Sequence, residues 1–228
     1  MQPWPVVHYH SIRTVRSNFN QAAISSQAPF IMSNVPIDQI DAVFRLMSRE
    51  IWIVTAAAGE DRGGLAATWV SPASIDRENP LAVIALAPNH YTCELVERSG
   101  CFAAHLIRPD QIDLVWRFGL GSGRVTDKLS GITTHSGETG SPVLSDCLGR
   151  FEGRVVDRHD TGDRVYFWAE VVAGEKLGEG RPLCEQALIA AASPEQLGSL
   201  RTQMGEDVQI QRPLCSEWLE RASSLLKK

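Results

Sequence analysis

The amino-acid sequence predicts a mainly β fold with peripheral helices, an α+β protein built on an antiparallel sheet. Three apolar runs of strand length recur along the chain, separated by glycine-rich or polar turns: residues 51–58, 81–87 and 101–107. Further on, two alternating segments at 148–158 and 163–172 flank the turn residues 159–162, which is the pattern of a long β-hairpin. Shorter segments of helical periodicity lie between these strands, and we expect them at the periphery of the sheet.

The bulk composition is that of a folded protein without a polyanionic partner. With 228 residues and 43% hydrophobic content, the chain can bury a core of ordinary size. A net charge of -5, a pI near 5.7 and the lack of any cluster of Lys and Arg argue against binding to nucleic acid or to a membrane surface. The sequence shows neither an apolar run long enough to span a bilayer nor the pattern of a signal peptide, so we expect a cytoplasmic protein.

The cysteines predict neither a disulfide framework nor a metal site. They are widely spaced and odd in number, and no two form a Cys-x-x-Cys pair: Cys93, Cys101, Cys147, Cys184 and Cys215. Buried free thiols are therefore expected, and no metal ligand is nominated.

The two ends of the chain are predicted to be appendages of one central body at 36–175. Residues 1–35 have little periodicity and are interpreted as an arm that packs on the body or on a second subunit. The body begins with a helix whose apolar residues fall at helical spacing: Ile37, Ile40, Val43, Phe44 and Met47. Residues 176–228 are predicted to form a helical extension of three helices, at 182–192, 194–204 and 213–226. Its expected packing positions are Trp218, Leu219 and Leu225.

The stretch 63–75 is too polar for an ordinary core strand. It follows the strand at 51–58 through a glycine-containing turn, so the two should form a hairpin. Small and hydroxylated residues, among them Thr68, Ser71 and Ser74, stand where large apolar ones are expected. Small side chains let a flat ligand lie against the backbone, whose N–H groups can hydrogen-bond the ligand together with the hydroxyls. The alternative is an edge strand followed by a Ser/Pro turn.

A candidate anion site comes after the third strand. Residues 91–99 have helical character and stop at Gly100, with Asn89 or Thr92 placed to cap the start. A helix N-terminus attracts an anion, although a plain cap is the simpler alternative. His105 lies in the next strand, and since no Asp or Ser pattern supports a catalytic triad, we interpret it as structural.

A glycine-rich loop at 119–129 follows a predicted helix at 109–118. Its three closely spaced glycines suggest a phosphate-binding loop, but the G-x-x-x-x-G-K-[ST] spacing is absent and a helix rather than a strand precedes it. Lys128, near the end of this loop, is either a cation close to a ligand or a solvated surface lysine.

The order of these features closely resembles the flavin reductase-like FMN-binding split barrels, in particular the flavoredoxin branch. The resemblance spans roughly residues 36–175, and four motifs carry it: G-L-A-A-T-W-V-S-P-A-S at 64–74, Y-T-C-E-L-V at 91–96, S-G-C-F at 99–102 and S-G-R-V-T-D-K-L at 122–129. It implies an antiparallel split β-barrel of the FMN-binding type that forms a homodimer, with the flavin at or near the subunit interface. A small closed barrel hides its strand edges but is too narrow inside for a flavin, which agrees with an external groove.

The resemblance also implies a cofactor and a set of residues that bind it. FMN would accept a hydride from NADH or NADPH and pass electrons to free flavin, oxygen, a quinone or a protein. The isoalloxazine ring does the chemistry, so no catalytic residue is nominated. The ring and ribityl chain are expected at Ala67, Thr68, Trp69, Val70, Ser71, Ala73 and Ser74, with Thr68 projecting from its strand toward the flavin. The phosphate side is expected at Asn89, His90, Tyr91, Thr92 and Lys128.

One position departs from the family pattern. Relatives usually have G-D-H at the exit of the last hairpin turn, where this chain has Gly162, Asp163 and Arg164. That histidine commonly faces the flavin or the nicotinamide, so the change puts the usual route of hydride transfer in doubt, while an arginine could bind an anionic group. Two alternatives remain open. One, which Arg164 favours, is a non-enzymatic FMN-binding electron-transfer protein of the flavoredoxin type. The other is a related oxidoreductase that uses the same barrel for a different reaction, such as deazaflavin-dependent reduction or oxidation of an aromatic substrate.

Overall fold

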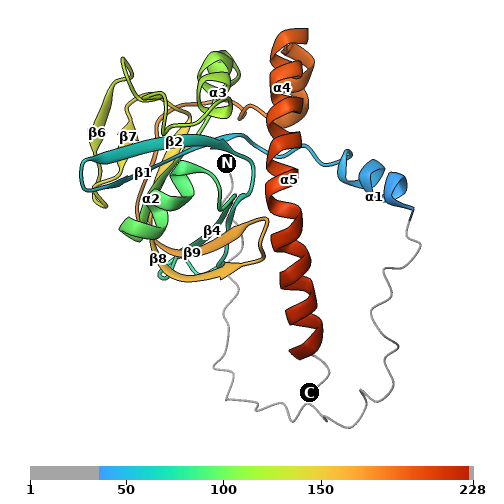
Figure 1. Cartoon of the computed structure of the whole chain (residues 1–228). Coiled ribbons are helices and arrows are strands. Elements are labelled where there is room, and N and C mark those ends of the chain that lie inside the picture. Colours follow the sequence, from blue (N-terminus) through green and yellow to red (C-terminus); the bar gives the residue numbers. More distant parts are fainter. Residues whose placement is uncertain (1–35, 226–228) are drawn as a thin grey trace, which may run out of the picture.

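The fold is built on one curled antiparallel sheet. A computed structural model describes residues 36–225, so the predicted arm at 1–35 lies outside the described residues. The sheet has seven strands in the order β2-β1-β5-β8-β9-β4-β3. Their bounds are Trp52–Ala58 (β1), Asp61–Ala67 (β2), Val70–Pro72 (β3), Leu81–Leu86 (β4), Cys101–Leu106 (β5), Gly149–Asp160 (β8) and Val165–Lys176 (β9). A small second sheet pairs β6 (Thr134–Ser136) with β7 (Pro142–Leu144). The predicted fold class, a mainly β split barrel with peripheral helices, is confirmed (Figure 1).

The two edge strands of this sheet follow each other in the sequence. β2 ends at Ala67 and β3 begins at Val70, yet they stand at opposite ends of the strand order. The sheet must therefore curl until its two edges meet at Thr68 and Trp69, where the Ala85 N–H donates to the Trp69 carbonyl oxygen at 2.9 Å. Such curling covers edges that would otherwise be free to pair with another chain.

This junction corrects the prediction of one strand through 63–75. Thr68 and Trp69 lie between β2 and β3, so Thr68 does not project from a strand as expected. The physical reason is the change of edge: the chain leaves β1, its partner in β2, and joins β4, its partner in β3. No local pattern marks that crossing.

The β1–β2 hairpin is confirmed, with a tight turn and a glycine that is required inside the strand. Gly59 takes a φ of 67° in the turn, and Thr55 faces Gly64 across the pair. Gly64 has a packing role, because a Cβ there would lie only 2.7 Å from Cε1 of Phe118. The strand also begins earlier than predicted, since Asp61 already pairs with Ala58.

Two helices that lie between strands in the sequence both pack against β2. α2 (Tyr91–Ser99) buries Cys93, Leu95 and Val96, and it ends at Gly100, whose φ of 67° is the left-handed conformation that glycine favours. α3 (Ile112–Gly119) buries Val115, Trp116 and Phe118. The predicted helix at 109–118 begins instead as a short 3-10 turn, Pro109–Gln111.

His105 joins three elements of the core. Its Nδ1 lies 2.9 Å from the Ile53 carbonyl oxygen, and the Leu144 N–H donates to its Nε2 at 3.0 Å. These partners place the ring proton on Nδ1 and link β1, β5 and β7. Burial lowers the pKa of His105 to about 4, so the ring is neutral at physiological pH. The structural interpretation of this histidine is confirmed.

The thiols only partly follow the expectation of burial. Cys93 and Cys147 are buried, and burial raises the pKa of Cys93 to about 12 and that of Cys147 to about 11. The other three cysteines are partly exposed. Among residues 36–225, no group of three or more His, Cys, Asp or Glu side chains is arranged to hold a metal ion, and no helix there is both long and apolar enough to cross a membrane.

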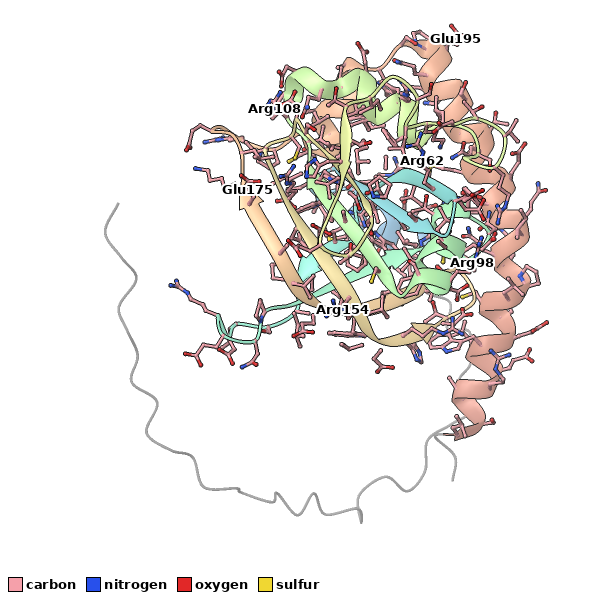
Figure 2. All side chains as sticks on the ribbon, turned by 90° about the vertical axis from the view of Figure 1, so that its left-hand side faces the viewer. Arg62, Arg98, Arg108, Arg154, Glu175 and Glu195 are labelled. Atoms are coloured by element: carbon pink, nitrogen blue, oxygen red, sulfur yellow. The ribbon has the colours of Figure 1, made fainter. Side chains whose placement is uncertain are left out.

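The C-terminal extension forms two helices rather than the three predicted. α4 (Glu185–Ala191) is followed by α5 (Pro194–Leu225), which continues through Pro213. α5 starts with a capping box, in which the Gln196 N–H donates to the Ser193 Oγ and the Ser193 N–H donates to the Gln196 Oε1. Figure 2 shows α5 running along one side of the barrel, with Glu195 in its first turn.

Two of the packing positions predicted for this extension are wrong. Leu219 and Leu225 are 38% and 71% exposed, whereas Trp218 lies edge-on to His159 with ring centroids 6.0 Å apart. α1 (Ile37–Phe44) likewise buries none of its residues and stands apart from the sheet (Figure 1).

Candidate functional site

The candidate site is a groove at the junction of β2 and β3, where three neighbouring hollows share residues. The first, of about 270 Å³, is lined by the predicted phosphate residues Asn89, His90, Tyr91, Thr92 and Lys128. The second, of about 420 Å³, is lined by the predicted ring residues Thr68, Trp69, Val70 and Ser71. A smaller hollow of about 120 Å³ lies between them and is lined by Ala67, Thr68, Trp69 and His90. Because the smaller hollow shares His90 with the first and Thr68 with the second, the three are neighbours along this junction, and together they are called the groove.

Ala73 and Ser74 do not line any of these three hollows. The Ser74 hydroxyl is exposed and donates within its own turn, to the carbonyl oxygens of Asp76 at 3.1 Å and Asn79 at 2.8 Å. Ser71 does line the second hollow, and its hydroxyl donates to the adjacent Pro72 carbonyl oxygen at 3.1 Å. The structure therefore brings ten of the twelve predicted site residues together around the groove and leaves two outside it.

Trp69 lines the second hollow, and two guanidinium groups lie over its ring. The Cζ atoms of Arg164 and Arg49 lie 4.9 Å and 5.7 Å from its ring centroid, and Tyr166 stacks beside it with centroids 6.3 Å apart. Arg49 is itself oriented by a bidentate contact with Glu185. This arrangement offers an aromatic surface next to fixed positive charge, which suits a flat group that carries or gains negative charge.

Sequence reasoning did not nominate Arg49 or Tyr166. Arg49 precedes β1 and Tyr166 lies in β9, so both reach Trp69 only because the sheet curls. No local signal in the sequence could have joined them. Arg164 was singled out as an unusual residue, but its position over the Trp69 ring was not predicted.

Lys128 is buried, so the interpretation as a solvated surface lysine is wrong. Its side chain is 6% exposed, and Nζ donates to the carbonyl oxygens of Phe118 at 2.9 Å and Gly121 at 2.8 Å. Burial lowers the pKa of Lys128 to about 8. The ammonium group thus satisfies carbonyls at the end of α3 and fixes the glycine-rich loop beside the first hollow.

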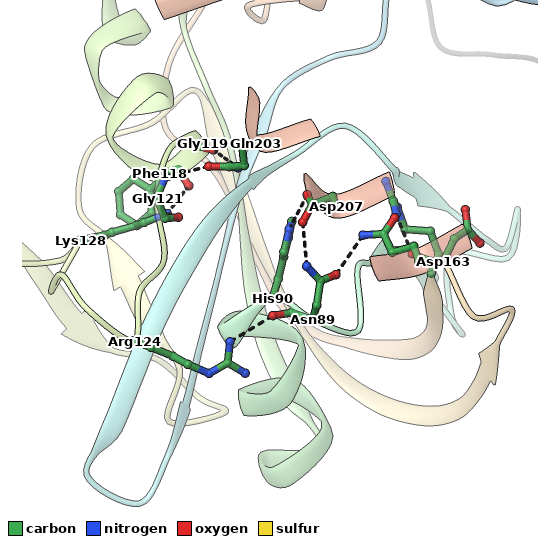
Figure 3. A network of polar contacts seen from close by, with 12 residues as sticks. Asn89, His90, Phe118, Gly119, Gly121, Arg124, Lys128, Asp163, Gln203 and Asp207 are labelled. Atoms are coloured by element: carbon green, nitrogen blue, oxygen red, sulfur yellow. Dashed lines mark hydrogen bonds and ion pairs between the residues drawn. The ribbon is translucent and has the colours of Figure 1, made fainter. Parts of the chain in front are cut away.

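The loop that starts α2 is engaged by α5 (Figure 3). Asn89 Nδ2 donates to Asp207 Oδ1 at 2.7 Å, and His90 Nε2 lies 2.9 Å from Asp207 Oδ2. Gln211 Nε2 donates to Asn89 Oδ1 at 2.9 Å. The expectation that Asn89 or Thr92 caps α2 is wrong. His90 holds the N-cap position, and its side chain makes no capping hydrogen bond.

Comparison with known proteins identifies the family of this chain. Residues 44–186 match the flavin reductase-like domain, which is more than half of the chain, so this chain belongs to the flavin reductase-like family. α5 begins after the matched segment ends.

Individual relatives are similar over the barrel. A diflavin flavoprotein of Synechocystis is 27% identical over 162 residues, which cover 69% of this chain but 26% of that protein. This chain thus spans about a quarter of the length of that curated relative. Among solved structures, an NADH:FAD oxidoreductase of Streptomyces globisporus has a TM-score of 0.59 at 18% identity, over 65% of this chain and 88% of that one. An FMN-binding protein of Thermus thermophilus has a TM-score of 0.54 at 24% identity, over 67% and 78%. These two likenesses establish the fold.

The family implies a flavin, and one half of the groove fits the flavin ring. Small residues at Ala66 and Ala67 and the partly exposed Trp69 line these hollows, which leaves room for a flat ring. The other half does not fit a phosphate while α5 is in place. Asn89 and His90 are already paired with the Asp207 carboxylate, and Glu206 lines the same hollow. A phosphate there would face two carboxylates.

Proposed function

We propose that this chain is an FMN-binding oxidoreductase that takes electrons from NADH or NADPH and passes them through the flavin to free flavin or another small acceptor. The observation that carries the proposal is the groove at the junction of the sheet edges, where small residues adjoin the Trp69 platform and two arginines. Membership of the flavin reductase-like family supports a flavin, and the names of two structural neighbours, one FMN-binding and one an NADH:FAD oxidoreductase, support the choice of donor and cofactor.

The bound flavin would supply the redox chemistry, because it accepts a hydride and releases electrons one or two at a time. The protein would bind and orient it. Thr68 offers a hydroxyl at the junction of β2 and β3, and Trp69 offers an aromatic side chain in the same hollows. The Arg49 and Arg164 guanidinium groups provide fixed positive charge next to that side chain, which favours a ring that becomes negative on reduction. No side chain is needed as a general acid or base.

We also propose that the functional form is a homodimer. The groove lies on the outside of a small barrel, and one subunit can cover only part of a flavin there. A second copy would shield the open side. This proposal rests on the geometry of one subunit and requires its own measurement.

A non-enzymatic electron carrier is the second candidate function, and Arg164 favours it. The Arg164 side chain lies over Trp69 and donates from Nη1 to Gln211 Oε1 at 2.8 Å. It stands at the sequence position where relatives usually have the histidine that faces the flavin or the nicotinamide. A carrier would hold FMN and exchange electrons without turning over NADH or NADPH.

The test is anaerobic reduction of the FMN-loaded protein, followed through the visible absorbance of the flavin. NADH or NADPH should bleach the flavin and sustain many turnovers once an excess of free FMN is added. Bleaching by dithionite but by neither nicotinamide would establish the carrier. A protein that retains no flavin would contradict both candidates.

A further inference from the structure

α5 is attached to the barrel by its polar side. Gln203, Asp207 and Gln211 are spaced four residues apart, so they share one face of the helix. Gln203 Oε1 accepts from the Gly121 N–H at 2.8 Å, and its Nε2 donates to the Gly119 carbonyl oxygen at 3.0 Å. With the pairing of Asp207 and Gln211 to the loop before α2, this face holds both the glycine-rich loop and the candidate phosphate loop (Figure 3).

Apolar packing holds only the first turns of α5, where Leu200 packs against the core cluster that contains Leu188. Within its described residues only Gln211 is buried. Large apolar side chains along the helix are 38% to 71% exposed: Met204, Val208, Ile210, Leu214, Leu219 and Leu225. An element held by polar contacts that water can replace, with little apolar burial, opens at low cost in free energy.

The start of α5 is anchored together with the neighbouring helix. α4 packs into the core through Leu188, which is 9% exposed, and Ala192 and Leu200 pack against the same cluster. Two residues separate α4 from α5, whose capping box fixes its first turn. The part of α5 that can leave the barrel is therefore the part beyond Leu200, which the polar contacts hold.

The contact made by α5 and the binding of a flavin phosphate exclude each other. Asp207 uses the same Asn89 and His90 side chains that a phosphate would need, and Glu206 lines the same hollow. Two carboxylates beside a phosphate dianion are strongly unfavourable.

We propose that α5 is a built-in cover of the flavin site, in which the Asp207 carboxylate competes with the FMN phosphate for Asn89 and His90. FMN binding then releases α5, and α5 in its closed position lowers the affinity for FMN. This proposal rests on the proposed function, because it requires that the groove binds FMN. It assigns the extension beyond the matched family domain a regulatory role at that same groove.

Two substitutions in the full chain open the cover by different physical routes. Asp207→Ala removes the competing carboxylate. Gly162→Ala adds a Cβ that would overlap the Leu214 backbone of α5 and so pushes the helix away without removing any polar side chain; because Gly162 has a φ of 86°, the variant also strains its own turn, which lowers stability. Glu220→Gln is the matched control, because it removes one negative charge from an exposed position of the same helix. Thermal unfolding of each variant establishes that the barrel is folded.

The readouts are the FMN dissociation constant, from quenching of flavin fluorescence, and hydrogen exchange of the α5 amides. Asp207→Ala should bind FMN about tenfold more tightly, Gly162→Ala should bind it more tightly as well, and Glu220→Gln should match the unmodified chain. Saturating FMN should accelerate exchange along 203–215 in the unmodified chain, and Asp207→Ala should show that acceleration without FMN.

Unchanged or weaker FMN binding by Asp207→Ala would overturn the proposal, as would α5 amides that stay equally protected with FMN bound. If neither the unmodified chain nor Asp207→Ala binds FMN, the cover and the proposed function fail together. If FMN binds and releases α5 but NADH and NADPH do not reduce it, only the proposed reaction fails.

Discussion

Thr68→Val tests whether the Thr68 hydroxyl, at the junction of β2 and β3, binds a ligand or only stabilises the fold. Thr68 is half buried between β2 and β3 and lines both hollows beside Trp69. Among the described residues, its hydroxyl makes no hydrogen bond within the fold, so valine preserves the shape and removes only a group available to a ligand. A neutral hydrogen bond contributes a net value of about 1 kcal/mol, which corresponds to a loss of FMN affinity between about twofold and tenfold.

Thr55→Val is the matched control for this experiment. The Thr55 hydroxyl is fully buried and donates to the Pro142 carbonyl oxygen, away from the groove. Its loss should lower the free energy of unfolding by about 1–3 kcal/mol and leave FMN affinity nearly unchanged. Flavin fluorescence titration and urea unfolding of both variants give the full comparison. An unchanged FMN dissociation constant in Thr68→Val, together with a lower unfolding midpoint, would refute the assignment of Thr68 to the ligand.

Three further predictions concern the fold and assembly. Gly64→Ala should destabilise the protein by about 1–3 kcal/mol in urea unfolding, because its Cβ would meet the Phe118 ring at 2.7 Å; an unchanged midpoint would contradict the packing. Because His105 has a folded pKa of about 4 against an ordinary 6.5, the unfolded state gains its proton first as the pH falls. Stability should therefore drop by roughly 3 kcal/mol across that window, and His105→Gln should remove most of this dependence. Light scattering should give twice the chain mass of 25.1 kDa, and a monomer with FMN fully bound would contradict the dimer.

The features that could be predicted from the sequence are those determined by residues close together in the chain. Apolar runs of strand length predicted β1, β4 and β5, and alternation predicted the β8–β9 hairpin. Gly100 marked the end of α2 because a left-handed residue closes that helix well. The groove residues around Thr68 and Asn89 were found through composition and family motifs. In each case a few neighbouring residues contain the physical cause.

The features that were missed depend on parts of the chain that meet only after folding. The break at Thr68 arises because the sheet curls, and Arg49 reaches Trp69 across the same curl. Pro213 was expected to begin a separate helix, yet α5 continues through it, since a proline there costs a backbone hydrogen bond without forcing the chain to turn. The contact between Asp207 and the loop before α2 joins residues more than a hundred positions apart, so no local pattern could predict it.

The central claim, that the groove at the sheet junction binds FMN, is tested most directly by titrating the full chain with FMN and measuring the quenching of flavin fluorescence. The account predicts saturable binding with a dissociation constant in the micromolar range or below, and tighter binding once Asp207 is replaced by alanine. The absence of quenching in both proteins, with the barrel folded, would contradict it.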